Sequence, residues 1–123
     1  MKKKRVAILN KNNNNDVASK FNNIGYKVDI FDDDVNIIKD IDLFDLILIH
    51  TDSDLKEAAK LKIRLYEQDM SKTVIIINGT CYPGLTIDEE KLLNSDDILL
   101  EIDNISKKTS PFVQMALCQM AKS

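Results

Sequence analysis

The sequence contains few of the residues from which phosphate loops, metal centres and disulfide frameworks are built. Its 123 residues include 3 glycines, 2 prolines, 2 cysteines and 1 histidine, and no tryptophan. The glycines stand at positions 25, 79 and 84, so none follows the first apolar run, where a glycine-rich phosphate loop belongs. This distribution excludes a dinucleotide-binding fingerprint, and it argues equally against a flavin-binding loop at NKNNNN.

The two cysteines, Cys81 and Cys118, are far apart and form no CxxC pattern. In a chain with no export signal, such cysteines are typical of free thiols in a reducing cytoplasm. We therefore expect a cytoplasmic protein with no metal centre and no other cofactor. No apolar stretch approaches the roughly 20 residues that span a bilayer, and the basic start lacks the apolar region of a signal peptide.

The charge balance is mildly acidic, with 17 basic and 20 acidic residues, a formal charge of −3 and a pI near 5.1. This balance provides no long-range attraction for nucleic acid or for an anionic membrane. The one basic run, Lys2–Arg5, is typical of a solvated flank beside a strand. A hydrophobic content of 44% and a charged content of 30% are those of a globular domain, and we expect residues 1–123 to form a single one.

Short apolar runs alternate with helical patterns along the chain. The runs predict strands over 5–10, 26–31, 45–50, 73–78 and 97–102, and the helical patterns predict helices over 16–25, 35–41, 53–68, 86–94 and 110–122. Gly25 is well placed to end the first helix, and Ser110 and Pro111 to begin the last. This alternation favours right-handed crossovers and an α/β fold in which helices cover both faces of a parallel sheet.

Four phrases of this pattern resemble strands of the response-regulator receiver domain: KKRVAILN (3–10), FDLILIH (44–50), KTVIIINGT (72–80) and SDDILLEID (95–103). The resemblance runs over essentially the whole chain. It implies a doubly wound, flavodoxin-like three-layer sandwich with a five-stranded parallel sheet in the order 2-1-3-4-5. It also implies a pocket at the carboxyl edge of the sheet. There an acidic pair holds Mg²⁺, an aspartate accepts the phosphoryl group, and a hydroxyl and a lysine bind the phosphoryl oxygens.

At each position of that pocket, this chain has a residue of another type than the receiver domain has. The acidic pair falls on Asn10 and Lys11, the acceptor aspartate on His50, the hydroxyl on Asn78 and the lysine on Glu101. A lysine beside the metal position repels a divalent cation, which prefers hard oxygen ligands. The chain therefore resembles a degenerate receiver domain. We expect it to act in signal transduction independently of phosphorylation and without enzymatic activity.

His50 admits several interpretations. We favour a partly buried imidazole that is hydrogen-bonded to a loop. The alternatives are a phosphoacceptor imidazole, or a transition-metal ligand together with Asp52. The crevice around Asn10, His50 and Asn78 is also where open α/β sheets bind small molecules or anions, so a sensor function stays open. A receiver that is still active through displaced residues is a further alternative. In the loop NGTCYPG, we do not expect Cys81 to be catalytic.

The last predicted helix, 110–122, is apolar on more than one side, which a helix covering a single sheet face does not require. Receiver-like proteins commonly pair through the surface formed by their fourth helix, fifth strand and fifth helix. We therefore expect a homodimer or a protein partner to bind through the last strand and the last helix. The predicted contact residues are Phe112, Met115, Leu117 and Met120.

Overall fold

The computed structural model describes residues 4–10, 16–51, 55–78, 86–108 and 110–122. Strands and helices alternate over most of this range. Their order is β1 (Arg5–Asn10), α1 (Asp16–Asn23), β2 (Lys27–Phe31), α2 (Val35–Lys39), the 3-10 helix η1 (Ile41–Leu43), β3 (Leu46–Thr51), α3 (Leu55–Gln68), β4 (Thr73–Asn78), β5 (Thr86–Asp88), α4 (Glu89–Asn94), α5 (Ile98–Lys108) and α6 (Pro111–Lys122).

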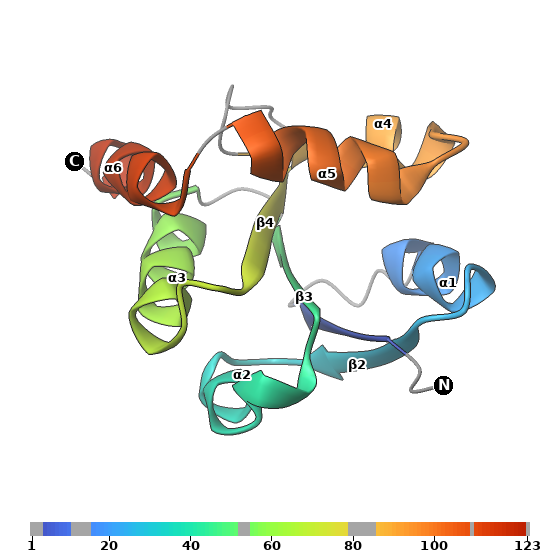
Figure 1. Cartoon of the computed structure of the whole chain (residues 1–123), viewed down its shortest axis with the longest axis horizontal. Helices are drawn as coiled ribbons and strands as arrows, with labels where there is room; N and C mark the ends of the chain where they lie inside the picture. Colours follow the sequence, from blue (N-terminus) through green and yellow to red (C-terminus); the bar gives the residue numbers. More distant parts are fainter. Residues whose placement is uncertain (1–3, 11–15, 52–54, 79–85, 109, 123) are drawn as a thin grey trace.

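The strands form one parallel sheet in the order β2-β1-β3-β4-β5, as predicted. The order reverses between β1 and β3, which makes the fold a doubly wound, flavodoxin-like sandwich. Helices lie on both sides of the sheet (Figure 1). Because all strands are parallel, their carboxyl ends meet at one edge, and this edge is where the predicted pocket residues should converge.

Alternate side chains of the central strands enter two separate cores. Ala7 of β1, Ile47 of β3 and Ile76 of β4 pack with α2, α3 and α6 on one face. The residues next to them, such as Ile8 and Leu48, pack with α1, α4 and α5 on the other. This two-sided burial explains why β1, β3 and β4 are continuous apolar runs rather than alternating ones.

The fifth strand is not the one that the sequence predicts, and this prediction was wrong in two linked ways. Residues 97–102, expected as a strand, lie at the start of helix α5. Residues 86–88, expected as the first turn of a helix, form strand β5, which pairs with β4 through Ile76–Thr86, Ile77–Ile87 and Asn78–Asp88. Helix α4 then begins at Glu89.

The physical reason lies in the spacing and capping of these segments. Ile98 and Ile102 are buried and Ile105 is half-buried, whereas Leu99 and Leu100 are exposed. Spacings of four and three are those of one helix face. The carboxylate of Asp97 accepts a hydrogen bond from the backbone N–H of Leu100 (3.1 Å) and so caps α5. Asp88 caps α4 by accepting from the N–H of Glu90 (3.0 Å).

The last helix begins as the sequence predicts. Pro111 is its first residue, and the hydroxyl of Ser110 accepts a hydrogen bond from the N–H of Val113 (3.3 Å). Helix α6 packs mainly on α3, and Figure 1 shows the two side by side at the C-terminal end of the molecule. Within the described part of the chain, the helices are all too short or too polar to cross a membrane.

Gly25 ends the turn that follows α1, as predicted, with a positive φ of 97°. Its N–H donates to the carbonyl of Asn22 (3.1 Å), and the N–H of Tyr26 donates to the carbonyl of Phe21 (3.0 Å). These two bonds satisfy carbonyls that the helix end would otherwise leave open, and they turn the chain into β2.

We predict that Gly25→Ala lowers the free energy of unfolding by about 1–2 kcal/mol, because an L side chain is strained at positive φ even though open space surrounds this position. Urea unfolding followed by circular dichroism measures the change. Asn23→Ala, an exposed substitution at the end of α1, is the matched control. An unchanged midpoint for Gly25→Ala would contradict the assigned turn.

Candidate functional site

The structure brings together three of the predicted pocket positions at the carboxyl edge of the sheet. Asn10 on β1 lies opposite His50 on β3, and Thr51 lies opposite Asn78 on β4. This juxtaposition confirms the placement that the strand pattern predicts. The side chains of Asn10 and Asn78 lie outside the described residues, as do the whole of Lys11, Asp52 and Cys81. Of these predicted residues at this edge, His50 is therefore the one whose side chain the structure describes.

His50 is a buried side chain, only 3% exposed, at the end of β3. Its Nε2 lies 3.2 Å from Oε2 of Glu89, the first residue of α4. Since β4 lies between β3 and β5, this contact crosses the carboxyl end of β4. The favoured interpretation, an imidazole held by a neighbouring group, agrees with this geometry, although the partner begins a helix rather than belonging to a loop. Protonation of the imidazole makes the contact an ion pair.

Glu89 is the functional residue of this edge that sequence reasoning missed. The whole of 86–94 was predicted as one helix, which places Glu89 inside the helix rather than beside the sheet edge. Its position directly after the Asp88 cap is the signal that was available. The other ring nitrogen of His50, Nδ1, is buried and has no hydrogen-bond partner among the described residues.

Glu101 does not belong with these residues, and its assignment to the lysine position of the pocket was wrong. That assignment required a strand over 97–102, whereas Glu101 lies in the first turn of α5. A helix residue on the face of the sheet cannot take the place of a residue that follows a strand. Within the parts of the chain that the structure describes, no three His, Cys, Asp or Glu side chains are grouped to hold a metal ion.

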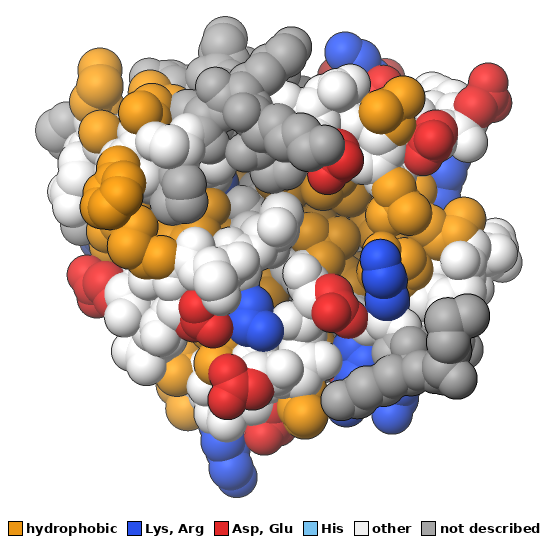
Figure 2. All heavy atoms as spheres, viewed as in Figure 1, with side chains coloured by type: hydrophobic (Ala, Val, Ile, Leu, Met, Phe, Trp, Pro, Cys, Tyr) orange, Lys and Arg blue, Asp and Glu red, His pale blue; other side chains and the backbone are white. Residues whose placement is uncertain are grey.

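The four predicted contact residues of α6 divide between the two sides of the helix. Met115 and Leu117 are half-buried and pack against the core, so they offer a partner less surface than fully exposed residues. Phe112 and Met120 are 75% and 64% exposed, and Val113, which was not among the contact residues, is 49% exposed. Hydrophobic side chains gather over this end of the molecule in Figure 2.

A buried polar cluster joins α6 to α3 on the opposite side of the helix. Gln114 and Cys118, one turn apart on α6, are both buried, as are Lys62 and Tyr66, one turn apart on α3. The hydroxyl of Tyr66 donates to Oε1 of Gln114 (2.8 Å). Because this bond is shielded from water, sliding α6 along α3 would break a buried hydrogen bond, which is unfavourable. The cluster therefore sets which side of α6 faces outward.

Lys62 is the most unusual member of this cluster, because its side chain is fully buried. Its Nζ has no hydrogen-bond partner among the described residues and lies 5.6 Å from the ring centroid of Tyr66. Burial lowers the pKa of Lys62 from 10.5 to about 8, partly offset by attraction to Cys118. The sequence places Lys62 within the apolar stripe of its helix, and that was the signal for burial.

Comparisons with known proteins bear on the fold of the chain. No family model matches the sequence, and no curated protein matches it. Among solved structures, HP1043, an orphan response regulator of H. pylori, is similar with a TM-score of 0.52 and 18% identity, over 85% of this chain and 95% of that chain. A fusion that carries the trimeric coiled coil of yeast Spc42 is similar with a TM-score of 0.50 and 17% identity, over 99% of this chain and 78% of that chain.

These similarities agree with the strand order and show a receiver-like, flavodoxin-like fold. The structure differs from the predicted alternation of strands and helices after β4. There a short strand is followed by two helices on one face of the sheet and a last helix on the other. The carboxyl edge, the α3–α6 cluster and the outer side of α6 are the features of this chain that bear on the predicted site residues.

We predict that Lys62→Met raises the free energy of unfolding at pH 7 by about 1–3 kcal/mol, because it replaces a buried amine, whose burial is only partly offset by Cys118, by an apolar side chain of similar length. Between pH 8 and 10.5 the unfolded wild type holds a proton that the folded chain has lost, so wild-type stability rises across this window. Burial raises the pKa of Tyr66 to about 12, so the phenol stays neutral there.

Urea unfolding at pH 7 and at intervals up to pH 10 measures both effects. Lys62→Met should flatten the rise in stability that the wild type shows. Lys60→Met, on the exposed side of the same helix, is the matched control and should stay within about 0.5 kcal/mol of the wild type. If Lys62→Met does not raise the free energy of unfolding relative to Lys60→Met, interactions within the folded chain compensate for the burial of the Lys62 amine, and the prediction is wrong.

Proposed function

We propose that the chain is a phosphorylation-independent, receiver-like protein-interaction module of a signalling system, and that it binds through the outer side of α6. A second copy of the chain is the simplest occupant. The observation that carries this proposal is the exposure of Phe112, Val113 and Met120 on one helix whose other side is fixed to α3. An apolar stripe held rigidly outward is typical of a contact surface.

The carboxyl edge supports the first half of the proposal. A receiver that transfers phosphoryl groups needs an accessible acceptor and a cation at this edge. Here the acceptor position holds an imidazole whose side chain is 2% exposed and lies against Glu89. The negative charge of Glu89 repels an incoming phosphoryl donor. These two features support signalling through a contact surface rather than through modification of His50.

The geometry of α6 supports the second half. Phe112, Val113, Ala116, Gln119 and Met120 are all exposed, and they recur at the spacing of one helix face. Four of the five are apolar. Methionine and phenylalanine adapt to and fill a partner surface, and such side chains are enriched in the buried centres of interfaces. Two copies of this stripe can pack against each other without bringing charges together.

We predict that the wild type forms a concentration-dependent dimer that the double substitution Phe112→Glu, Met120→Lys dissociates. Glutamate in the first turn and lysine in the last turn suit the helix dipole, so α6 itself should stay folded. Sedimentation velocity from micromolar to near-millimolar concentration measures association, and circular dichroism with thermal melting checks the fold.

Val35→Glu is the matched control for this experiment, because Val35 is a 61% exposed apolar residue on α2 rather than on α6. It should leave association unchanged. A wild type that stays monomeric throughout, or a double variant that associates as strongly as the wild type, would contradict docking through α6.

We also predict that incubation with acetyl phosphate and Mg²⁺ adds no phosphoryl group to the chain. Intact-mass spectrometry after brief incubation, without acid treatment, gives the measurement, since phosphohistidine is lost in acid. An active receiver domain treated in parallel is the control. A mass increase by one phosphoryl group that His50→Ala abolishes would show that the buried imidazole is reached, and it would sink the phosphorylation-independent proposal.

A further inference from the structure

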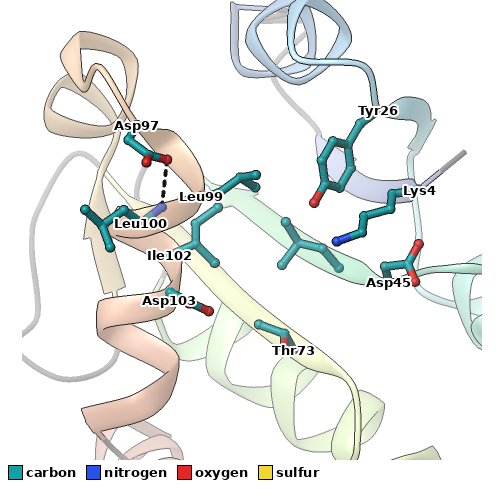
Figure 3. Close-up of a pocket in the computed structure, with 10 residues that line it drawn as sticks. Lys4, Tyr26, Asp45, Thr73, Asp97, Leu99, Leu100, Ile102 and Asp103 are labelled. Carbon is teal, nitrogen blue, oxygen red and sulfur yellow. Dashed lines mark hydrogen bonds between the residues drawn. The ribbon is translucent and has the colours of Figure 1, made fainter.

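The cavity in Figure 3, of about 510 Å³, lies where β3 and β4 begin and beside the first turns of α5. Its three carboxylates, those of Asp45, Asp97 and Asp103, all take part in interactions within the chain. The bond between Asp97 and the N–H of Leu100 is drawn as a dashed line in that figure. These carboxylates give no indication of a ligand, and the buried cluster between α3 and α6 carries the inference instead.

This cluster holds an amine and a thiol from two helices that are far apart in the sequence. Lys62 and Tyr66 lie one turn apart on α3, and Gln114 and Cys118 lie one turn apart on α6. The hydrogen bond from Tyr66 to Gln114 (2.8 Å) joins one residue of each pair. Burial raises the pKa of Tyr66 and lowers that of Lys62, and the charge of Cys118 raises both. The thiol therefore lies near the amine of Lys62 as well as near Tyr66.

Both groups are buried, and the amine has no hydrogen bond. Lys62 and Cys118 are each 0% exposed. Nζ of Lys62 has no hydrogen-bond partner among the described residues, and Cys118 forms no disulfide with any of them. Burying an amine without a hydrogen bond is unfavourable for folding, and such groups are found where a redox or catalytic role retains them. The pair is therefore a candidate for chemistry and not for packing alone.

The surroundings of the pair suit both partners of an oxidative coupling. An amine is nucleophilic only when it is neutral, and burial lowers the pKa of Lys62 from 10.5 to about 8. About half of the molecules therefore carry the neutral amine at pH 8. In the other half, the ammonium group favours the thiolate of the neighbouring cysteine, which is the form that peroxides oxidise.

We propose that hydrogen peroxide converts Lys62 and Cys118 into a covalent sulfur–nitrogen link that fastens α6 to α3. In the first step, Sγ of Cys118 forms a bond to one peroxide oxygen, the oxygen–oxygen bond breaks, and the other oxygen leaves as water with the thiol proton. In the second step, Nζ of Lys62 attacks Sγ of the resulting sulfenic acid, whose hydroxyl leaves as water with a proton of the amine. The chain loses two hydrogens in all, and a dithiol reductant returns both.

The link closes a long loop between residues 62 and 118. It restricts the unfolded chain as a disulfide does, so the linked protein should melt at a higher temperature than the reduced protein. It lies on the inner side of α6 and does not involve Phe112 or Met120. The inference is therefore independent of the interaction proposed for the outer side of α6, and either can fail without the other.

The experiment uses the full chain with Cys81→Ser, so that Cys118 is its one cysteine and no internal disulfide can form. After treatment with hydrogen peroxide at a pH near the pKa of Lys62, about 8, intact-mass spectrometry should show a chain lighter by two hydrogens. Peptide mapping should find the segments around Lys62 and Cys118 joined, and dithiothreitol should restore the original mass.

Lys62→Met removes the amine and should give only oxygen adducts of Cys118, such as the sulfinic acid. Lys60→Met, on the exposed side of α3, is the matched control and should form the link as the parent chain does. The proposal is overturned if the parent chain gains only oxygen, if Cys118 does not react, or if the loss of two hydrogens persists in Lys62→Met.

Discussion

Three neighbouring strands that are apolar on both faces are the constraint on which this structure depends. β1, β3 and β4 direct apolar side chains to both faces of the sheet, with Ile8 and Leu48 on one face and Ala7 and Ile47 on the other. Each face must therefore be covered by helices. Only residues 79–85 separate β4 from β5. The cover beside α3 is instead completed by α6, which returns to that face after α4 and α5 have covered the other.

The position of α6 links the packing to the proposed interaction. Its inner side carries Gln114 and Cys118 against Tyr66 and Lys62. The buried hydrogen bond between Tyr66 and Gln114 favours one register of the two helices, because a slipped arrangement breaks it. The outer side is left with an apolar stripe that no described element covers. At the carboxyl edge, His50 lies in a contact with Glu89, and this contact supports the proposal that the chain acts through a surface rather than through phosphotransfer.

Sequence reasoning succeeded where hydrophobic pattern alone decides the structure. The boundaries predicted for the first four strands agree with those observed to within one residue, because three are continuous apolar runs and the other, β2, alternates between apolar and polar residues. It failed over 86–102, where an apolar run of strand-like composition is helical. Ile98 and Ile102 suit a strand or a helix equally well over so short a window. Capping by Asp97 favours the helix over residues 98–108. Pairing of Ile87 with Ile77 favours the strand over residues 86–88.

The sequence by itself determined the parallel sheet and the meeting of Asn10, His50 and Asn78 at one edge, because strand ends follow directly from periodic burial. Only the tertiary structure decided that Glu89 faces His50, that α6 is the helix that packs over α3, and that Met115 faces inward while Met120 faces out. Each of these depends on how helices settle against one another and against the sheet. That arrangement follows from side-chain packing between segments distant along the chain, about which local residue patterns carry no information.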